Sequence, residues 1–335
     1  MAGSPIFLVG LFYWSHLKRR RGSRNLLAVA AGLAALGWAA LVLAALGPAV
    51  CAAQNAPTRV VIDETDRKIN VPAEVRRIVS IAPSVTETIY ALGAEARLVG
   101  DTDYCDDPPE AKTKPHVGAL LNPSFEAILA LKPDLVISSA INRPETVLAL
   151  ERLGVPVYAT DPRSVEGTVD SIEGLGELIG AERAGKMLAA QLRARLDNLH
   201  RRLAGRPPKR VLFVVWEDPL ISVGPNTFLA DALRQAGAES VVETTQDWPK
   251  LSLEEAVRLQ PEALVFASAG AGTKSDDYDG LRERPGWGAL EAVKQGRIAV
   301  VSDALDRPAP RMIDAIEQLA RQLHPEAFGA QEGKR

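Results

Sequence analysis

The sequence predicts an α/β protein with two similar α/β lobes joined by a single long rigid helix, and a ligand cleft between the lobes. The first observation is a repeat, because residues 124–137 and 252–265 share one pattern. Each begins with serine, has an acidic residue two positions later, continues with apolar residues at helical spacing and reaches a proline before an apolar run. Serine is a favoured N-cap, an acidic residue suits the positive end of a helix, and proline ends it. Each segment therefore predicts a capped helix followed by a strand.

Two further pairs of segments repeat in the same order. Residues 77–81 and 210–214 each place a continuous apolar run after a basic residue, which suits strands buried on both faces. Residues 154–158 and 296–301 each place a short strand after a glycine that ends a helix. Three repeats in one order indicate two lobes, and clefts between domains are common sites for small ligands.

The segment between the lobes predicts two helices. Residues 164–205 contain no proline, and their apolar residues follow helical spacing with a break near Gly180. The second helix, over residues 181–203, would be roughly 35 Å long at about 1.5 Å per residue and can act as a stiff strut. Its many charged residues predict a solvated face. We therefore expect five parts: a signal peptide or N-terminal membrane anchor (1–53), an N-terminal lobe (54–180), the bridging helix (181–205), a C-terminal lobe (206–330) and a tail (331–335).

Composition agrees with this organisation. A chain of 335 residues that is 47% hydrophobic and 24% charged exceeds what one hydrophobic core usually serves. The first 53 residues contain five of the 39 basic residues and no acidic ones, so 34 basic residues face 42 acidic ones in the remainder, for a net charge of −8. This acidic balance argues against nucleic acid as a partner.

The N-terminus has the pattern of a targeting segment. A basic stretch at residues 18–24 precedes an uncharged apolar run over residues 26–53 that ends in small residues. We expect cleavage near Ala52 or Ala53. The alternative is an uncleaved membrane anchor, because about 20 apolar residues suffice to cross a bilayer. In either case the globular part is expected to be periplasmic, or on the extracytoplasmic face of the membrane.

Cysteine usage adds one question. Cleavage would remove Cys51 and leave Cys105 alone, so that no internal disulfide could form. A lone thiol is usually a small packing residue. A reactive thiol is the alternative, since His116 is close in sequence.

Four motifs carry a resemblance to a known family. They are RIVSIAPSVTE at residues 77–87, GDTDYC at residues 100–105, LKPDLV at residues 131–136 and RPAPR at residues 307–311. Each motif is weak alone, but together they are specific. The chain resembles the class III substrate-binding proteins of ABC importers over about residues 59–328. The resemblance implies two α/β lobes on one rigid helix, and a corrinoid, an iron-siderophore or haem as ligand.

The segments at residues 216–220, 223–228 and 247–252 are most similar to the vitamin B12-binding arm of that family. The resemblance implies cobalamin or a related corrinoid as the transported ligand, held between aromatic side chains, with an iron-siderophore or haem as the alternative. Trp248 matches one of these aromatic residues. Leu120 has the same register in the first lobe, so we expect both to face the cleft from opposite sides. This sequence departs from the family at Leu120 and Ser139, where the family has aromatic residues. For Trp248, the alternative interpretation is a tryptophan of the hydrophobic core.

Further ligand contacts are expected at strand ends, because ligands bind beyond the carboxyl ends of strands in open α/β sheets. This rule selects Pro83 and Ser84 in the first lobe and Glu217, Asp218 and Arg307 in the second. The resemblance adds four more candidates from its motifs, namely Asp103, Tyr104, Trp216 and Arg311. An arginine fork suits amide or carboxylate groups of a ligand. The alternative for both arginines is that they fix the C-terminal segment by bonding backbone carbonyls.

Glu126 and Glu254 occupy equivalent positions in the two repeats. In the family, such a pair docks onto arginines of the permease, and charge complementarity fixes orientation in complexes of that kind. The resemblance therefore implies an ABC permease homodimer with its ATPase as partner. The alternative is that each glutamate only stabilises the start of its helix.

Enzyme activity is not expected. The His and Cys residues are not spaced as metal ligands are. The sequence also contains no glycine-rich phosphate-binding loop, no nucleophile-elbow serine motif and no zinc-binding helix motif. We expect no catalytic residue, no metal site and no cofactor, the small-molecule metal chelate being cargo. The remaining alternative is a membrane-tethered ligand sensor without a transport role. Because a long helix resists hinge motion, the lobes should shift only modestly on binding.

Overall fold

The computed structural model describes residues 57–268 and 275–329. From Pro57 onward the chain forms one compact unit. The predicted signal peptide or anchor and the predicted tail lie outside the described residues. Within the described ranges, none of the helices is both long and apolar enough to cross a membrane.

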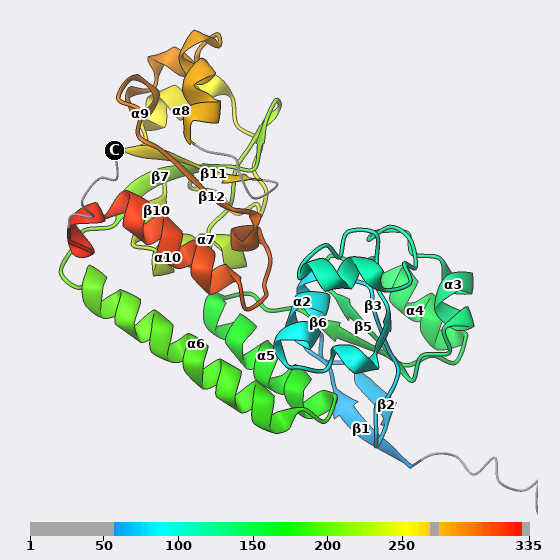
Figure 1. Cartoon of the computed structure of the whole chain (residues 1–335). Helices are drawn as coiled ribbons and strands as arrows, with labels where there is room; N and C mark the ends of the chain where they lie inside the picture. Colours follow the sequence, from blue (N-terminus) through cyan, green and yellow to red (C-terminus); the bar gives the residue numbers. More distant parts are fainter. Residues whose placement is uncertain (1–56, 269–274, 330–335) are drawn as a thin grey trace, which may run out of the picture. The chain divides into compact units, whose positions relative to one another are not determined.

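The N-terminal lobe is built on a four-stranded parallel sheet of order β4-β3-β5-β6 (Figure 1). Its strands are β3 (Ile78–Ser80), β4 (Leu98–Gly100), β5 (Leu135–Ser139) and β6 (Val157–Thr160). All residues of β3, β5 and β6 are buried, as their continuous apolar runs predict. The lobe also contains the antiparallel hairpin β1 (Thr58–Ile62) and β2 (Lys68–Pro72), the helices α2 (Pro83–Ala91), α3 (Phe125–Ala130) and α4 (Pro144–Arg152), and the 3-10 helices η1 (Glu95–Arg97) and η2 (Pro109–Thr113).

The C-terminal lobe repeats this arrangement with the order β10-β7-β11-β12. Its parallel strands are β7 (Lys209–Val214), β10 (Ala238–Ser240), β11 (Ala263–Ser268) and β12 (Ile298–Ser302). In both lobes the first strand lies between the second and the third. The other elements are the small hairpin β8 (Trp216–Glu217) and β9 (Leu220–Ile221), the helices α7 (Phe228–Gln235), α8 (Leu253–Leu259), α9 (Glu291–Lys294) and α10 (Met312–Leu323), and the 3-10 helices η3 (Ser275–Glu283), η4 (Trp287–Ala289), η5 (Asp303–Asp306) and η6 (Pro325–Ala327).

The predicted helix caps are present in both repeats. The Ser124 hydroxyl accepts from the Ala127 N–H at 3.2 Å, and the Ser252 hydroxyl accepts from the Glu255 N–H at 3.1 Å. Each satisfies a backbone donor that the first turn leaves free. The sequence repeat therefore corresponds to a structural repeat of helix and strand.

Two antiparallel helices join the lobes and lie side by side in Figure 1. They are α5 (Val165–Leu178) and α6 (Glu182–Leu203), and the predicted break between them is at Gly180, which has φ of 74°. The 22 residues of α6 span roughly 33 Å, because each residue adds about 1.5 Å. On the predicted solvated face of α6, Asp197, Arg201 and Arg202 are exposed, whereas Arg193 and Arg195 are half-buried in ion pairs. Arg193 pairs with three carboxylates of α5, and Arg195 pairs with Asp314 and Glu317 of α10.

The helix pair shares its hydrophobic core with both lobes. One cluster of buried residues includes Ile78 of β3, Val169 of α5, Leu192 of α6 and Ile316 of α10. Smaller clusters lie in each lobe apart from this one. The connection is therefore packed into the protein and is not a flexible linker.

A close approach of α5 and α6 yields the first prediction. A Cβ atom on Gly176 would lie 2.9 Å from the Cα atom of Gly185, whereas a Cβ atom on Gly174 would meet nothing within 4 Å. We expect Gly176→Ala to lower the free energy of unfolding by roughly 1–3 kcal/mol through overpacking. Gly174→Ala in the same helix should raise it by roughly 0.5–1 kcal/mol, because alanine is the better helix former. Urea unfolding of both variants checks this, and equal effects would contradict the packing argument.

Candidate functional site

A cavity of about 570 Å³ is lined by residues of both lobes. The loops that follow β3, β5 and β6 contribute from the N-terminal lobe, and the loops before α7 and α8 and the end of η5 contribute from the C-terminal lobe. Its lining consists of Ala82, Pro83, Ser84, Tyr104, Leu120, Ser139, Ala140, Ile141, Thr160, Asp161, Pro162, Arg163, Thr227, Phe228, Asp247, Trp248, Asp306, Arg307 and Pro308. The rule that ligands bind beyond the carboxyl ends of strands therefore describes most of this surface.

Six of the eleven predicted ligand contacts line this cavity, namely Pro83, Ser84, Tyr104, Leu120, Trp248 and Arg307. They come from five separate stretches of sequence and both lobes. Leu120 and Trp248 contribute to its wall from opposite lobes, as their repeat register predicts. The alternative of a core tryptophan is wrong, because Trp248 is 51% exposed.

The other five predicted contacts are not among the lining residues. The N–H of Asp103 donates to the carbonyl of Gly118 at 3.0 Å within its own loop. Trp216 lies in the β8–β9 hairpin and, with Glu217 and Asp218, lines a separate cavity of about 360 Å³. The strand-end rule was therefore wrong in assigning Glu217 and Asp218 to the cavity between the lobes. Arg311 bonds carboxylates of the N-terminal lobe.

Sequence reasoning missed several polar residues of the cavity. Asp161 and Arg163 follow β6, Asp247 precedes Trp248, and Asp306 precedes Arg307. The strand-end rule could have found the first two, because β6 ends at Thr160. Asp306 faces the cavity, where surrounding protein atoms raise its pKa to about 6 despite the neighbouring Arg307.

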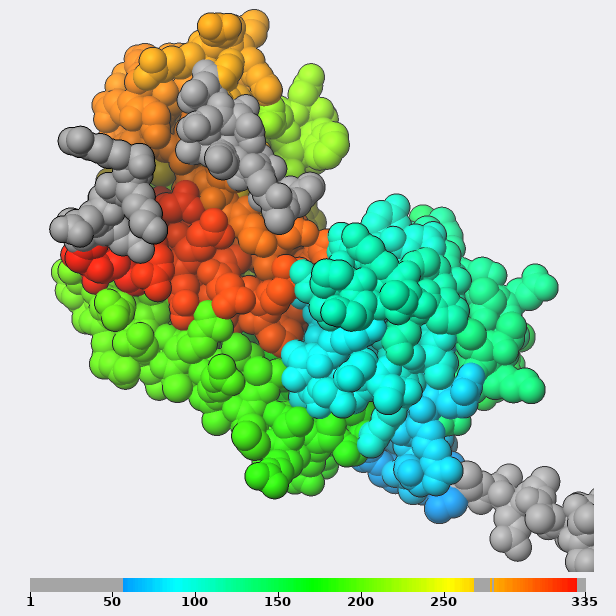
Figure 2. Space-filling model, in the orientation of Figure 1, coloured from blue at the N-terminus to red at the C-terminus, as the bar shows by residue number. Residues whose placement is uncertain are grey.

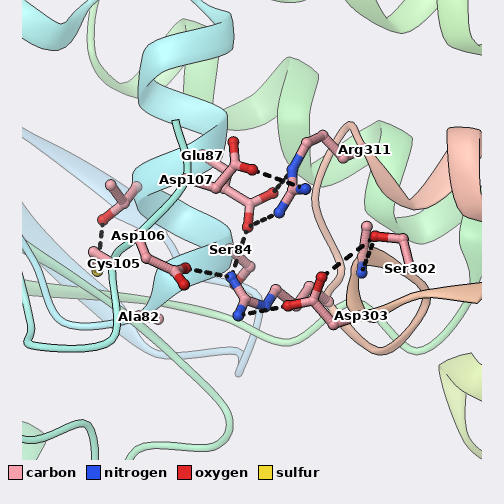
Figure 3. A network of polar contacts seen from close by, with 12 residues as sticks. Ala82, Ser84, Glu87, Cys105, Asp106, Asp107, Ser302, Asp303 and Arg311 are labelled. Carbon is pink, nitrogen blue, oxygen red and sulfur yellow. Dashed lines mark hydrogen bonds and ion pairs between the residues drawn. The ribbon is translucent and has the colours of Figure 1, made fainter. Parts of the chain in front are cut away.

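Arg307 and Arg311 join the two lobes through one group of ion pairs, which we call the interlobe network (Figure 3). It consists of Glu87, Asp106 and Asp107 from the N-terminal lobe and Asp303, Arg307 and Arg311 from the C-terminal lobe. In Figure 2 the orange-red C-terminal segment lies against the cyan part of the N-terminal lobe. The alternative that the arginines bond backbone carbonyls is wrong, since the partners are carboxylates.

The environment of Arg307 favours its charged form. Burial alone would lower the pKa of this guanidinium, but the carboxylates of Asp303 and Glu87 outweigh burial and raise it. The guanidinium is therefore a permanent donor at the cavity wall.

Cys105 is a packing residue, as the more common role of a lone thiol predicts. It is buried, and its Sγ lies 3.2 Å from the hydroxyl of Thr86 and 3.3 Å from that of Thr102. Burial raises the pKa of the thiol, which disfavours the reactive thiolate. His116 bonds Asp101 at 2.8 Å instead, and burial raises the pKa of that carboxyl to about 6.

Glu126 and Glu254 are the second helical residues of α3 and α8, and both side chains are exposed. Neither side chain forms an ion pair with another described residue. Glu145 is also exposed and occupies the same position in α4. The chain thus provides a glutamate of equal charge and helix position outside the repeat.

Comparison with known proteins adds three findings. The uncharacterized ABC transporter substrate-binding lipoprotein YvrC of Bacillus subtilis (strain 168) is 30% identical over 312 residues, which cover 87% of this chain and 97% of that protein. The crystal structure of the periplasmic vitamin B12-binding protein BtuF of Vibrio cholerae has a TM-score of 0.65 at 28% identity, covering 76% of this chain and 99% of that one. The periplasmic heme-binding protein BhuT, in complex with two hemes, has a TM-score of 0.67 at 28% identity, covering 75% and 98%.

The family model of the periplasmic binding proteins matches residues 78–305, from the first strand of the N-terminal sheet to the segment just before Arg307. That range contains both parallel sheets and the helix pair that joins them. Because the match extends over most of the chain and the relatives are covered nearly end to end, the similarity is not confined to one lobe. The chain belongs to the periplasmic binding protein family, as a class III substrate-binding protein of the ABC transporters.

Proposed function

We propose that this substrate-binding protein captures cobalamin or a related corrinoid in the cavity between its lobes and delivers it to an ABC permease. The mechanism is capture and docking without bond-making. The observation that carries the ligand class is the charge pairing in the cavity wall.

Both arginines of the wall already have carboxylate partners. Arg163 bonds Asp161 at 2.8 Å, and Arg307 bonds Glu87, Asp106 and Asp303. Among the described lining residues, each arginine therefore already has a carboxylate partner, and a ligand carboxylate would have to compete with it. Haem has two propionates, and burying an uncompensated charge is costly. The periphery of a corrinoid instead presents neutral amides, which donate to carboxylates and accept from guanidiniums.

The apolar part of the wall suits a large flat ring. Trp248 and Leu120 come from opposite lobes, and Pro83, Ile141 and Phe228 add further apolar surface. Aromatic faces stack on flat π-systems, and an aliphatic wall still contributes about 25 cal/mol per Å² buried. The similarity to a vitamin B12-binding protein supports the same ligand class.

An iron-siderophore or haem is the second candidate, and Tyr104 is the observation that favours it. Tyr104 lines the cavity and is 57% exposed. A phenol oxygen can ligate ferric iron. The similarity to a heme-binding protein supports this alternative.

Delivery requires a partner, and we propose that Glu126 and Glu254 dock the protein onto a permease homodimer that works with its ATPase. Two equivalent exposed carboxylates on two similar lobes match a partner with two equivalent basic surfaces. A membrane-tethered ligand sensor would need neither residue. The N-terminal segment, as a cleaved signal peptide or a retained anchor, would place the protein outside the cytoplasm in either case.

Calorimetric titration of the full chain in detergent with cyanocobalamin, haem and a ferric siderophore tests the ligand class. We expect submicromolar binding of cyanocobalamin. Haem should bind at least ~30-fold more weakly. This corresponds to a loss of ~2 kcal/mol in binding free energy, because its carboxylates have no unpaired cation among the described wall residues to bond. Tighter binding of haem or of the siderophore would overturn the corrinoid assignment and keep the transport role.

A further inference from the structure

The side chain of Glu87 is buried in α2 and has its counterions in the other lobe. Only 3% of the side chain is exposed. Its Oε2 accepts from Nε of Arg311 at 3.0 Å, and its Oε1 accepts from Nη2 of Arg311 at 3.1 Å and from Nη1 of Arg307 at 3.2 Å. Figure 3 shows the Glu87 carboxylate and the Arg311 guanidinium pointing toward each other. No cation of its own lobe, among the described residues, pairs with this carboxylate.

The position of Arg311 is not explained by the stability of its own helix. Arg311 is the N-cap residue of α10 and makes no side-chain capping bond. A cation is unfavourable at a helix N-terminus, where the backbone carries partial positive charge. The carboxylates of Glu87 and Asp107, which are distant in the chain, offset this cost. Arg311 is therefore favourable at the start of α10 only when the C-terminal lobe contacts the N-terminal lobe.

Arg307 connects this network to the ligand cavity. Its guanidinium lines the cavity and also bonds Glu87, Asp106 and Asp303. Arg311 bonds the same Glu87 carboxylate but does not line the cavity. Glu87 thus holds one arginine that can contact a ligand and one that cannot.

We propose that Glu87 is a positioning residue that fixes Arg307 at the cavity wall and holds the two lobes at the separation that retains the ligand. In the absence of its carboxylate, Arg307 keeps only Asp106 and Asp303 among the described residues, and Arg311 keeps only Asp107. The C-terminal segment then loses its bidentate bond to α2, which is the most strongly directed contact of the network. The part of this inference that concerns ligand retention rests on the proposed function. The part that concerns the separation of the lobes does not.

Two variants test it without replacing a residue that lines the cavity. Glu87→Gln removes the charge and keeps the shape of the side chain. Arg311→Met removes the second partner. The matched control is Glu145→Gln, which removes an exposed glutamate of α4 that lies outside the network. Each variant is made in the full chain, in a Cys51→Ser background, with spin labels at Leu148→Cys in α4 and Arg258→Cys in α8, two exposed positions on different lobes. The buried Cys105 is not expected to label.

We expect both variants to broaden the interlobe distance distribution measured by electron spin resonance without ligand, and the control to leave it unchanged. The dissociation rate of cyanocobalamin should rise about tenfold or more in each variant, with a smaller change in the association rate. Because both variants break the Glu87–Arg311 bond, the effect of the double variant on the dissociation rate should be smaller than the sum of the two single effects. Each single variant also loses one further ion pair, so the double variant can release the ligand faster than either.

Unchanged distances in both variants would overturn the proposal, and so would additive effects on the dissociation rate. Thermal unfolding of each variant shows whether a broader distance distribution accompanies general destabilisation. If cyanocobalamin does not bind at all, the proposed ligand fails, and the distance measurement still decides the role of Glu87.

Discussion

Replacement of Trp248 by alanine is expected to weaken corrinoid binding about 50-fold while leaving the fold intact. Trp248 lines the cavity and is about half exposed. A tryptophan can bury roughly 200 Å², so the exposed half is worth ~2.5 kcal/mol at about 25 cal/mol per Å² when a ligand covers it. This energy corresponds to a change in Kd of roughly 50-fold to 100-fold. Calorimetric titration with cyanocobalamin measures it directly.

Trp216 provides the matched control. It lies in the same lobe, is 62% exposed, and lines the other cavity. Trp216→Ala should therefore change the Kd for cyanocobalamin less than threefold, within ~0.6 kcal/mol. Trp248→Phe should keep most of the affinity, because the ring face is retained. Equal losses for Trp216→Ala and Trp248→Ala would mean that the ligand site is not the cavity between the lobes.

The fold was predictable because its repeated elements are encoded locally. Ser124 and Ser252 cap their helices with side chains only three residues from their backbone partners. The break at Gly180 needs a left-handed backbone that glycine adopts without cost. The similar register of the two repeats then placed Leu120 and Trp248 in one cavity, although they are far apart in the chain.

The roles of the arginines were less predictable, because their partners are distant in sequence. Arg311 and Glu87 are 224 residues apart, and no local pattern relates them. Trp216 follows the buried strand β7, as a cavity residue would, but the β8–β9 hairpin carries it to a second cavity. Asp306 was missed for the same reason, since its environment depends on how the chain folds around the cavity. Local rules thus find strand ends and caps, and the pairing of charges across lobes requires the structure.

Replacement of both Glu126 and Glu254 by alanine is expected to abolish ligand uptake while ligand affinity stays within twofold of that of the unaltered protein. Both side chains are exposed, and neither lines the cavity. Truncating one partner of a well-placed charge pair in an interface costs about 2–5 kcal/mol, so even ~2 kcal/mol per site would reduce docking ~30-fold for each glutamate. The measurement is uptake of labelled cobalamin into vesicles or cells that contain the transporter, compared with titration of the same variant in detergent.

The control variant separates docking from helix stability. Glu145→Ala removes an exposed glutamate from the same position of α4, so it loses the same helix-terminus contribution of ~0.3–1 kcal/mol. If the paired glutamates only stabilise their helices, all three substitutions should have similar small effects on unfolding and none on uptake. Normal uptake by the double variant would therefore exclude these residues as the docking pair and favour a sensor that binds its ligand without delivering it. We expect each single variant to lose less uptake than the double variant, because each lobe would contact one of two equivalent permease subunits.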